Sequence, residues 1–209
     1  HDPGRSARPY LPASTFKILN ALIALDTGVA KGPDERLAWD GVKRDFPAWN
    51  QDLDLRQAFA VSAVWYYQEL ARRIGPERMA QGVARAGYGN QDIGGGIDRF
   101  WLDGDLRISA LEQVAFLRRL EAGTLPFSAR AQEAVRDIMV LERGEGYVLR
   151  AKTGWTARVE HQIGWLVGWV ERADGAHFFA LNIDLPTPEA AKARFTVAKA
   201  ILREQGLIP

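Results

Sequence analysis

The sequence of 209 residues contains no cysteine, which excludes disulfide bonds, thiolate metal sites and a cysteine nucleophile. It also lacks an excess of either charge, since 27 Lys and Arg residues oppose 26 Asp and Glu residues. This balance gives no electrostatic basis for binding nucleic acid or an acidic membrane surface. No apolar run reaches the roughly 18 residues that a membrane-spanning helix requires. His1, His161 and His177 have neither ligand spacing nor an acidic neighbour, so no metal site is expected.

What is present describes an ordinary folded domain. Hydrophobic residues make up 47% of the chain and charged residues 25%, which predicts one domain, or one domain with two lobes, around a real core. The first ten residues, HDPGRSARPY, are polar and contain proline, which is not the pattern of an export signal.

The first two thirds of the chain predict helices separated by loops. Apolar residues recur at helical spacing, and glycine or proline marks several helix ends. Ser109 and Glu112 form an S-x-x-E capping box. The expected helices cover 11–25, 62–74, 76–86, 109–120 and 128–142, with 29–60 irregular and 88–108 a long loop.

From residue 146 the pattern changes to that of strands. Three stretches rich in β-branched and aromatic residues, at 146–155, 162–172 and 175–184, predict an antiparallel meander, with Asp174-Gly175 as a hairpin turn. Trp165 and Trp169 are four residues apart on one strand, so both should face the core. A last helix should follow Pro186 and end near residue 204. The predicted class is therefore α+β, with helices covering an antiparallel sheet.

A serine stands three residues before a lysine at the start of the first helix, in PASTFKILN. This spacing lets Ser14 and Lys17 share one helix face. A lysine can activate a serine only if its amine is neutral, which requires an apolar pocket or a modification. The alternative for a lone S-x-x-K is an N-cap serine followed by a surface lysine.

Two later stretches favour the catalytic interpretation. Ser62-Ala63-Val64 opens an expected helix, and Lys152-Thr153-Gly154 ends an expected strand. Alone, each has an ordinary explanation as a helix cap or a strand end. Together and in this order they correspond to the S-x-x-K, S-D-N and K-T-G set of penicillin-binding proteins and class A β-lactamases.

With valine at the third position of the middle element, the sequence resembles the class D serine β-lactamases, the oxacillinases. The resemblance runs from about Tyr10 to Ile208. It rests on Ser14-Thr15-Phe16-Lys17, Ser62-Ala63-Val64, Tyr88-Gly89-Asn90, Trp101 and Lys152-Thr153-Gly154.

The resemblance implies the serine β-lactamase/penicillin-binding (DD-peptidase-like) fold. Residues 1–209 would be a single catalytic unit, with a helical lobe at about 29–140 inserted in an α/β lobe formed by 1–28 and 141–209. Family members carry further N-terminal strands in the same sheet. Because these are missing here, the sequence is expected to be a portion of a longer protein.

The resemblance also implies a mechanism. Ser14 would be acylated by the β-lactam, and Lys17, N-carboxylated by carbon dioxide or bicarbonate, would be the general base, with no other cofactor. An apolar wall would exclude water from that lysine and would consist of Phe16, Val64 and Leu102. The indole N–H of Trp101 would donate a hydrogen bond to the carbamate.

The same resemblance assigns the remaining residues. Ser62 would pass a proton to the lactam nitrogen with help from Lys152, and the backbone N–H groups of Ser14 and Trp155 would form the oxyanion hole. The substrate-binding residues would be Thr153, Gly154, Arg194, Tyr88 and Asn90, with Lys192 or Lys199 as alternatives to Arg194 and with a supporting role as the alternative for Tyr88 and Asn90.

Two other functions use the same nucleophile. A β-lactam-sensing domain acylates without turnover, and a penicillin-binding transpeptidase usually carries a polar third residue where this chain has Val64. The expected partner is a small β-lactam, with a homodimer left open. The family implies a periplasmic or secreted location. Loops 91–104 and 155–162 should decide which β-lactams are favoured.

Overall fold

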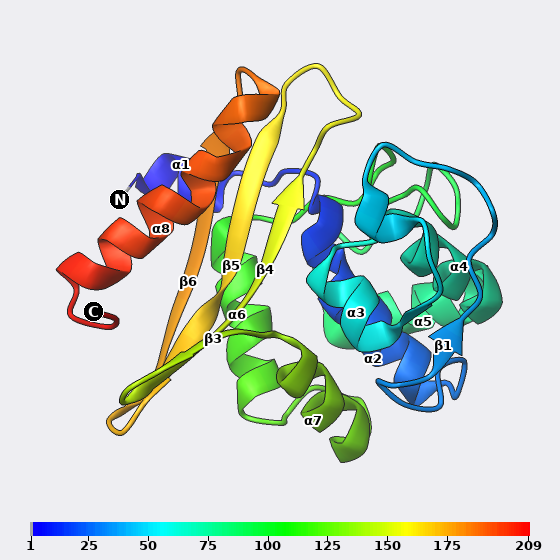
Figure 1. Ribbon diagram of the computed structural model, residues 1–209, viewed down its shortest axis with the longest axis horizontal. Coiled ribbons are helices and arrows are strands. Elements are labelled where there is room, and N and C mark those ends of the chain that lie inside the picture. The colour runs from blue at the N-terminus through cyan, green and yellow to red at the C-terminus, as the bar shows by residue number, and fades with distance from the viewer. Residues whose placement is uncertain (1) are drawn as a thin grey trace.

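The computed structural model describes residues 2–209 and shows a four-stranded sheet beside a group of helices (Figure 1). The strands are antiparallel in the order β3-β4-β5-β6. The last three form the predicted meander, whereas β3 is an edge strand that was not predicted. Their bounds are Val140–Gly144 for β3, Tyr147–Trp155 for β4, Ile163–Arg172 for β5 and Gly175–Asp184 for β6.

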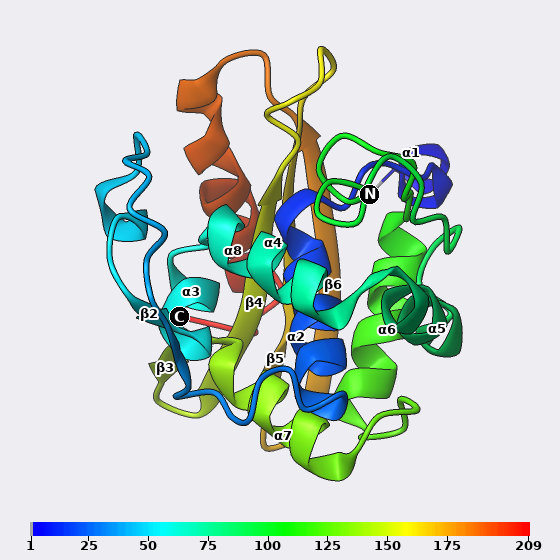
Figure 2. The same cartoon turned by 90° about the vertical axis from the view of Figure 1, so that its right-hand side faces the viewer.

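The helices lie on both faces of the sheet and beside it. Helices α6 and α8 pack on the strands, whereas α2 packs against α4, α5 and α7 (Figures 1 and 2). The bounds are Pro3–Ala7 (α1), Lys17–Asp26 (α2), Leu55–Ala60 (α3), Val64–Ile74 (α4), Pro76–Ala86 (α5), Ala110–Glu121 (α6), Ala129–Ile138 (α7) and Ala193–Glu204 (α8). Short elements are the 3-10 turns Ala13–Phe16 (η1), Pro47–Trp49 (η2) and Pro188–Lys192 (η3), and the strands Arg36–Leu37 (β1) and Leu53–Asp54 (β2).

Strand β5 is buried on both faces, which explains its almost continuous apolar sequence. Trp165 and Trp169 face the main core, as predicted, and neither exposes any of its surface. Leu166 and Val170 face the opposite way, into a smaller core completed by α8. The two-residue period of the strand thus serves two cores at once.

Strand β4 is longer than β3, and the difference leaves part of one edge free. Strand β3 reaches only as far as Arg150, which pairs with Val140. Residues 152–155 pair with β5 alone, and their free side faces the turn η1. Because backbone groups at such an edge have no strand partner there, they can bind a ligand.

Four details of the predicted secondary structure were wrong. The helix expected over 11–25 begins only at Lys17, after the 3-10 turn η1. The helix expected over 128–142 ends at Ile138, because Val140 and the residues after it pair with β4. Helix α4 begins at Val64, so Ser62 precedes it instead of opening it. Helix α3 lies inside the stretch expected to be irregular, although Asp54 and Gln57 form a capping box that the sequence already displays.

Helix α6 lies against the sheet. The predicted helical lobe contains α6, and this helix nevertheless packs on β5 and β6. The capping box of Ser109 and Glu112 is present as predicted, with Glu112 N–H donating to Ser109 Oγ at 3.2 Å. Residues 88–108 form no helix or strand, also as predicted.

Candidate active site

Ser14 lies in the 3-10 turn η1, directly before α2. The residue before it, Ala13, has φ +46°, a backbone conformation that costs a non-glycine residue of order 1–3 kcal/mol. Thr15 Oγ1 donates to the Pro12 carbonyl at 2.7 Å and accepts from Gln113 Nε2 at 2.8 Å. These buried hydrogen bonds hold the strained turn in place.

Lys17 is fully buried, and its Nζ lies 2.6 Å from Ser14 Oγ. Burial lowers the pKa of Lys17 well below its ordinary value, and the positive charges of Lys152 and Arg158 lower it further. The ring centre of Tyr67 lies 5.5 Å from Nζ. The direction of this shift favours the neutral amine that a serine-activating lysine requires, and the amine lies beside the hydroxyl.

Ser62 and Lys152 form the second pair of the site. Ser62 has φ +58° at the junction of α3 and α4, and its Oγ lies 3.0 Å from Lys152 Nζ. Lys152 Nζ also lies 3.2 Å from Thr153 Oγ1. Burial and the nearby charge of Arg194 lower the pKa of Lys152 to about 7. This amine can therefore exchange a proton with the Ser62 hydroxyl near neutral pH.

Gly154 lets the free edge of β4 approach the nucleophile turn. A Cβ atom at this position would lie 2.9 Å from the Pro12 carbonyl oxygen and 3.1 Å from Thr15 Cγ2. Any larger residue would push the strand away from Ser14. This close contact brings two segments that are far apart in the sequence to the same cleft.

Arg194, at the start of α8, reaches the same strand. Its Nη1 donates to the Gly154 carbonyl at 3.1 Å, and its Nε is buried without a hydrogen-bond partner among the described residues. Burial lowers the pKa of Arg194. Of the two alternatives, Lys192 is exposed and Lys199 pairs with Glu142 at 2.5 Å. Arg194 is the one of the three that lines the cleft.

The cleft between β4 and the helices has a volume of about 580 Å³. Its walls combine the predicted serines and the K-T-G strand with an aromatic segment that precedes α3. The residues that line it include Ser14, Ser62, Val64, Leu102, Thr153, Gly154, Trp155, Arg194, Arg44, Phe46 and Trp49.

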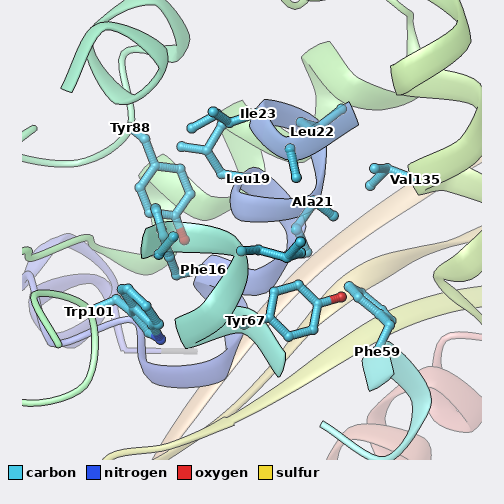
Figure 3. Close-up of a cluster of buried hydrophobic side chains, with 14 of the residues drawn as sticks. Phe16, Leu19, Ala21, Leu22, Ile23, Phe59, Tyr67, Tyr88, Trp101 and Val135 are labelled. Atoms are coloured by element: carbon cyan, nitrogen blue, oxygen red, sulfur yellow. The ribbon is translucent and has the colours of Figure 1, made fainter. Parts of the chain in front are cut away.

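Phe16, the residue before Lys17 in the sequence, stacks on Trp101 with ring centres 5.3 Å apart (Figure 3). Trp101 is fully buried, and its Nε1–H has no hydrogen-bond partner within residues 2–209. An unpaired buried donor costs about 1–3 kcal/mol. A carbamate on Lys17 would offer the acceptor oxygen that this indole lacks, so the donor set fits that group.

The structure does not support direct substrate contact by Tyr88 and Asn90, because neither lines the cleft. Tyr88 is fully buried beside Phe16 and Phe116, and its hydroxyl donates to Gln113 Oε1 at 3.4 Å. Asn90 is exposed and turned toward the chain segment 105–107. Both residues therefore lie outside the cleft.

The sequence analysis missed several residues of the site. Gln113 is a fully buried amide on the apolar face of α6, and this polar residue within the apolar stripe is a signal that could have identified it. Arg158, in the loop after β4, lies 3.5 Å from Asp103 and lines the cleft. No local pattern marks Arg158, because its partner lies in a distant loop.

Within residues 2–209 no three His, Cys, Asp or Glu side chains gather in a way that could hold a metal ion. No described helix combines the length and apolarity needed to cross a membrane. Acidic neighbours of the histidines do exist, contrary to expectation: His161 lies 3.0 Å from Asp184 and His177 3.2 Å from Asp174. His1 lies outside the described residues.

Comparison with known proteins agrees with this geometry. Residues 4–205 match the family described as "Penicillin binding protein transpeptidase domain". The chain is 47% identical over 205 residues to Beta-lactamase OXA-48 of Klebsiella pneumoniae, covering 98% of this chain and 77% of that protein. It is 46% identical over 209 residues to Beta-lactamase OXA-3 of Pseudomonas aeruginosa, covering 100% and 74%.

Solved structures give the same result. The class D β-lactamase YbXI from Nostoc superposes with a TM-score of 0.97 at 50% identity, covering 100% of this chain and 88% of that one. FUS-1 (OXA-85), a class D β-lactamase from Fusobacterium nucleatum subsp. polymorphum, also gives 0.97, at 40% identity, covering 100% and 87%. The paired serines and lysines, the fold that joins them and these relatives together show that the chain belongs to the class D β-lactamases.

Proposed function

We propose that the protein hydrolyses the amide bond of β-lactam antibiotics through an acyl-enzyme on Ser14, with N-carboxylated Lys17 as the general base. The observation that carries the proposal is the fully buried Lys17 amine, 2.6 Å from the Ser14 hydroxyl and with a strongly lowered pKa. Carbon dioxide reacts only with a neutral amine, which is the form that this environment favours. In a cell the activity would produce β-lactam resistance.

Carboxylation would also balance the charge of the site. The groups that lower the pKa of Lys17 by their charge, Lys152 and Arg158, are both positive. A carbamate forms an N–C bond at Nζ, loses one amine proton and carries a negative charge, so both cations would stabilise it. The unpaired Trp101 indole N–H would donate to one carbamate oxygen.

In acylation the carbamate would take the proton of Ser14 as Oγ attacks the lactam carbonyl. The backbone N–H groups of Ser14 and Trp155 would bind the developing oxyanion, for which a single donor typically contributes about 10²–10³ in rate. As the C–N bond breaks, Ser62 would give its proton to the lactam nitrogen and recover one from Lys152, 3.0 Å away.

The substrate carboxylate would bind at the free edge of β4. Thr153 supplies a hydroxyl and Arg194 a guanidinium next to the Gly154 carbonyl. In deacylation the same carbamate would remove a proton from a water molecule that attacks the ester. One base thus serves both halves of the reaction, so activity should depend on carbon dioxide.

The sensor and transpeptidase alternatives differ from this proposal in measurable ways. Val64 lines the cleft where an asparagine would solvate the Lys17 amine, which favours carboxylation and turnover. The test is hydrolysis of a chromogenic cephalosporin and of oxacillin, with and without added bicarbonate. Multiple turnover that bicarbonate stimulates, and that Lys17→Ala abolishes, is the expected result.

Two outcomes of this test would contradict parts of the proposal. A stoichiometric burst without turnover would exclude the hydrolase and indicate a sensor. Turnover that is indifferent to both bicarbonate and Lys17→Ala would leave hydrolysis standing and exclude the carbamate. A mass increment of carbon dioxide on Lys17, measured on the intact protein, gives an independent check.

A further inference from the structure

The loop between α5 and α6 carries Trp101 and Leu102 to the site, and it is closed at its base by one side chain. Asn90 Nδ2 donates to the Asp105 carbonyl at 2.9 Å, and Asn90 Oδ1 accepts from the Arg107 N–H at 2.9 Å. The Asn90 N–H also donates to the Arg107 carbonyl at 3.0 Å. Asn90 therefore joins the segment that enters the loop to the segment that leaves it.

Gly89 makes this close approach possible. It has φ +54°, and a Cβ at this position would collide with the Arg107 carbonyl oxygen, a backbone atom that has no free rotation with which to move away. Deeper in the loop, the Asp105 N–H donates to the Gly94 carbonyl at 3.1 Å. The base of the loop is thus closed by a short series of hydrogen bonds, and those farthest from the loop tip belong to Asn90.

The loop beyond this base is packed around the aromatic group next to Lys17. Phe100 and Trp101 are fully buried, and their ring centres lie 4.9 Å and 5.3 Å from that of Phe16. The Leu106 N–H donates to the Phe100 carbonyl at 3.2 Å, which connects the closed base directly to this group. Figure 2 shows the loop in green near the amino-terminal end of α2.

We propose that Asn90 is a positioning residue that closes the base of loop 90–107 and thereby holds Trp101 and Leu102 against Lys17. This gives the Tyr88-Gly89-Asn90 motif a role in forming the general base and not in binding substrate. The inference rests on the proposed function, because the carbamate is what the correctly placed Trp101 would stabilise. Opening the base lets the indole move away from Nζ and lets water reach the amine.

The experiment compares Asn90→Ala, Asn90→Asp and a control, Gln91→Asn. Gln91 is the exposed neighbour, has φ +60°, and its side chain makes no hydrogen bond within residues 2–209. Initial rates on a chromogenic cephalosporin are measured against bicarbonate concentration after removal of carbon dioxide. Asn90→Ala should raise the half-saturating bicarbonate concentration about tenfold, since the three side-chain hydrogen bonds of Asn90, to Asp105, Arg107 and Asp92, are lost. It should regain most of kcat when bicarbonate saturates.

Asn90→Asp distinguishes the loss of the loop-closing hydrogen bonds from a general loss of stability. It keeps the acceptor for the Arg107 N–H and loses the donor to the Asp105 carbonyl, so its bicarbonate requirement should fall between those of the wild type and Asn90→Ala. It also provides the test if Asn90→Ala does not fold. Gln91→Asn should match the wild type.

Three outcomes decide the question. A bicarbonate requirement unchanged by either Asn90 substitution, in a wild type that does depend on bicarbonate, overturns the proposal. A fall in kcat that saturating bicarbonate does not restore also overturns it, because a defect outside carbamate formation would be responsible. If the rate of the wild type does not depend on bicarbonate, the proposed general base is wrong instead. The closing role of Asn90 is then tested by hydrogen exchange. The backbone N–H of Leu106 must exchange faster in Asn90→Ala than in the wild type.

Discussion

Replacing Trp101 with phenylalanine removes an indole N–H that is buried without a hydrogen-bond partner among residues 2–209. The substitution keeps a ring to stack on Phe16, now 5.3 Å from the indole, and removes only the N–H and part of the ring. A hydrogen bond to a charged acceptor contributes about 1.5–3 kcal/mol. The half-saturating bicarbonate concentration should therefore rise roughly ten- to hundredfold.

The stability of the carbon dioxide-free protein should respond differently. Removing an unpaired buried donor should raise the free energy of unfolding by about 1–3 kcal/mol. The void left by the smaller ring should lower it by about 1–2 kcal/mol. These opposing effects nearly cancel, so the free energy of unfolding should change little. The predicted signature is a large loss of bicarbonate affinity without a comparable loss of stability, and the harsher Trp101→Ala should lose both.

The assay combines initial rates over a bicarbonate series with urea unfolding of the carbon dioxide-free protein. Trp39→Phe is a matched control, because it also removes an indole donor, the one to the Val42 carbonyl, away from the cleft. An unchanged bicarbonate requirement in Trp101→Phe would refute the assigned role of the indole. An equal increase in Trp39→Phe would show that the effect is not local.

The remaining predictions concern three residues of the cleft and its support. Because the folded-state pKa of Lys152 is lowered to about 7, the unfolded chain binds more protons between pH 7 and about 10.4. The free energy of unfolding should therefore rise with pH there, and Lys152→Met should flatten the slope; equal slopes would contradict this. Arg194→Ala should raise KM about tenfold for β-lactams while changing kcat little. The control Lys199→Ala should leave both KM and kcat unchanged. A fall in kcat without a rise in KM would contradict the assigned role of Arg194. Gln113→Leu should destabilise the fold by about 1–3 kcal/mol and lower kcat by loosening Thr15; urea unfolding and steady-state rates check both, and wild-type values of either would contradict it.

Much of the fold could be read from local patterns. The capping box of Ser109 and Glu112 fixed the start of α6, and the two-residue period of β5 placed Trp165 and Trp169 on one face. These features depend on residues within a few positions of one another. The helix predicted to reach residue 142 was wrong, because Val140 takes its conformation from β4, a strand that comes later in the chain.

The sequence by itself determined which chemical groups are available and where a helical turn would pair Ser14 with Lys17, since that pair is only three residues apart. Tertiary structure decided the rest. Ser62 and Lys152 are 90 residues apart and meet only because β4 lies against the α3–α4 junction. The lowered pKa of Lys17 needs walls from several elements, and the role of Asn90 depends on a chain segment that returns 15 to 17 residues later. Burial and long-range contact are properties of the assembled fold, and no local stretch of sequence contains them.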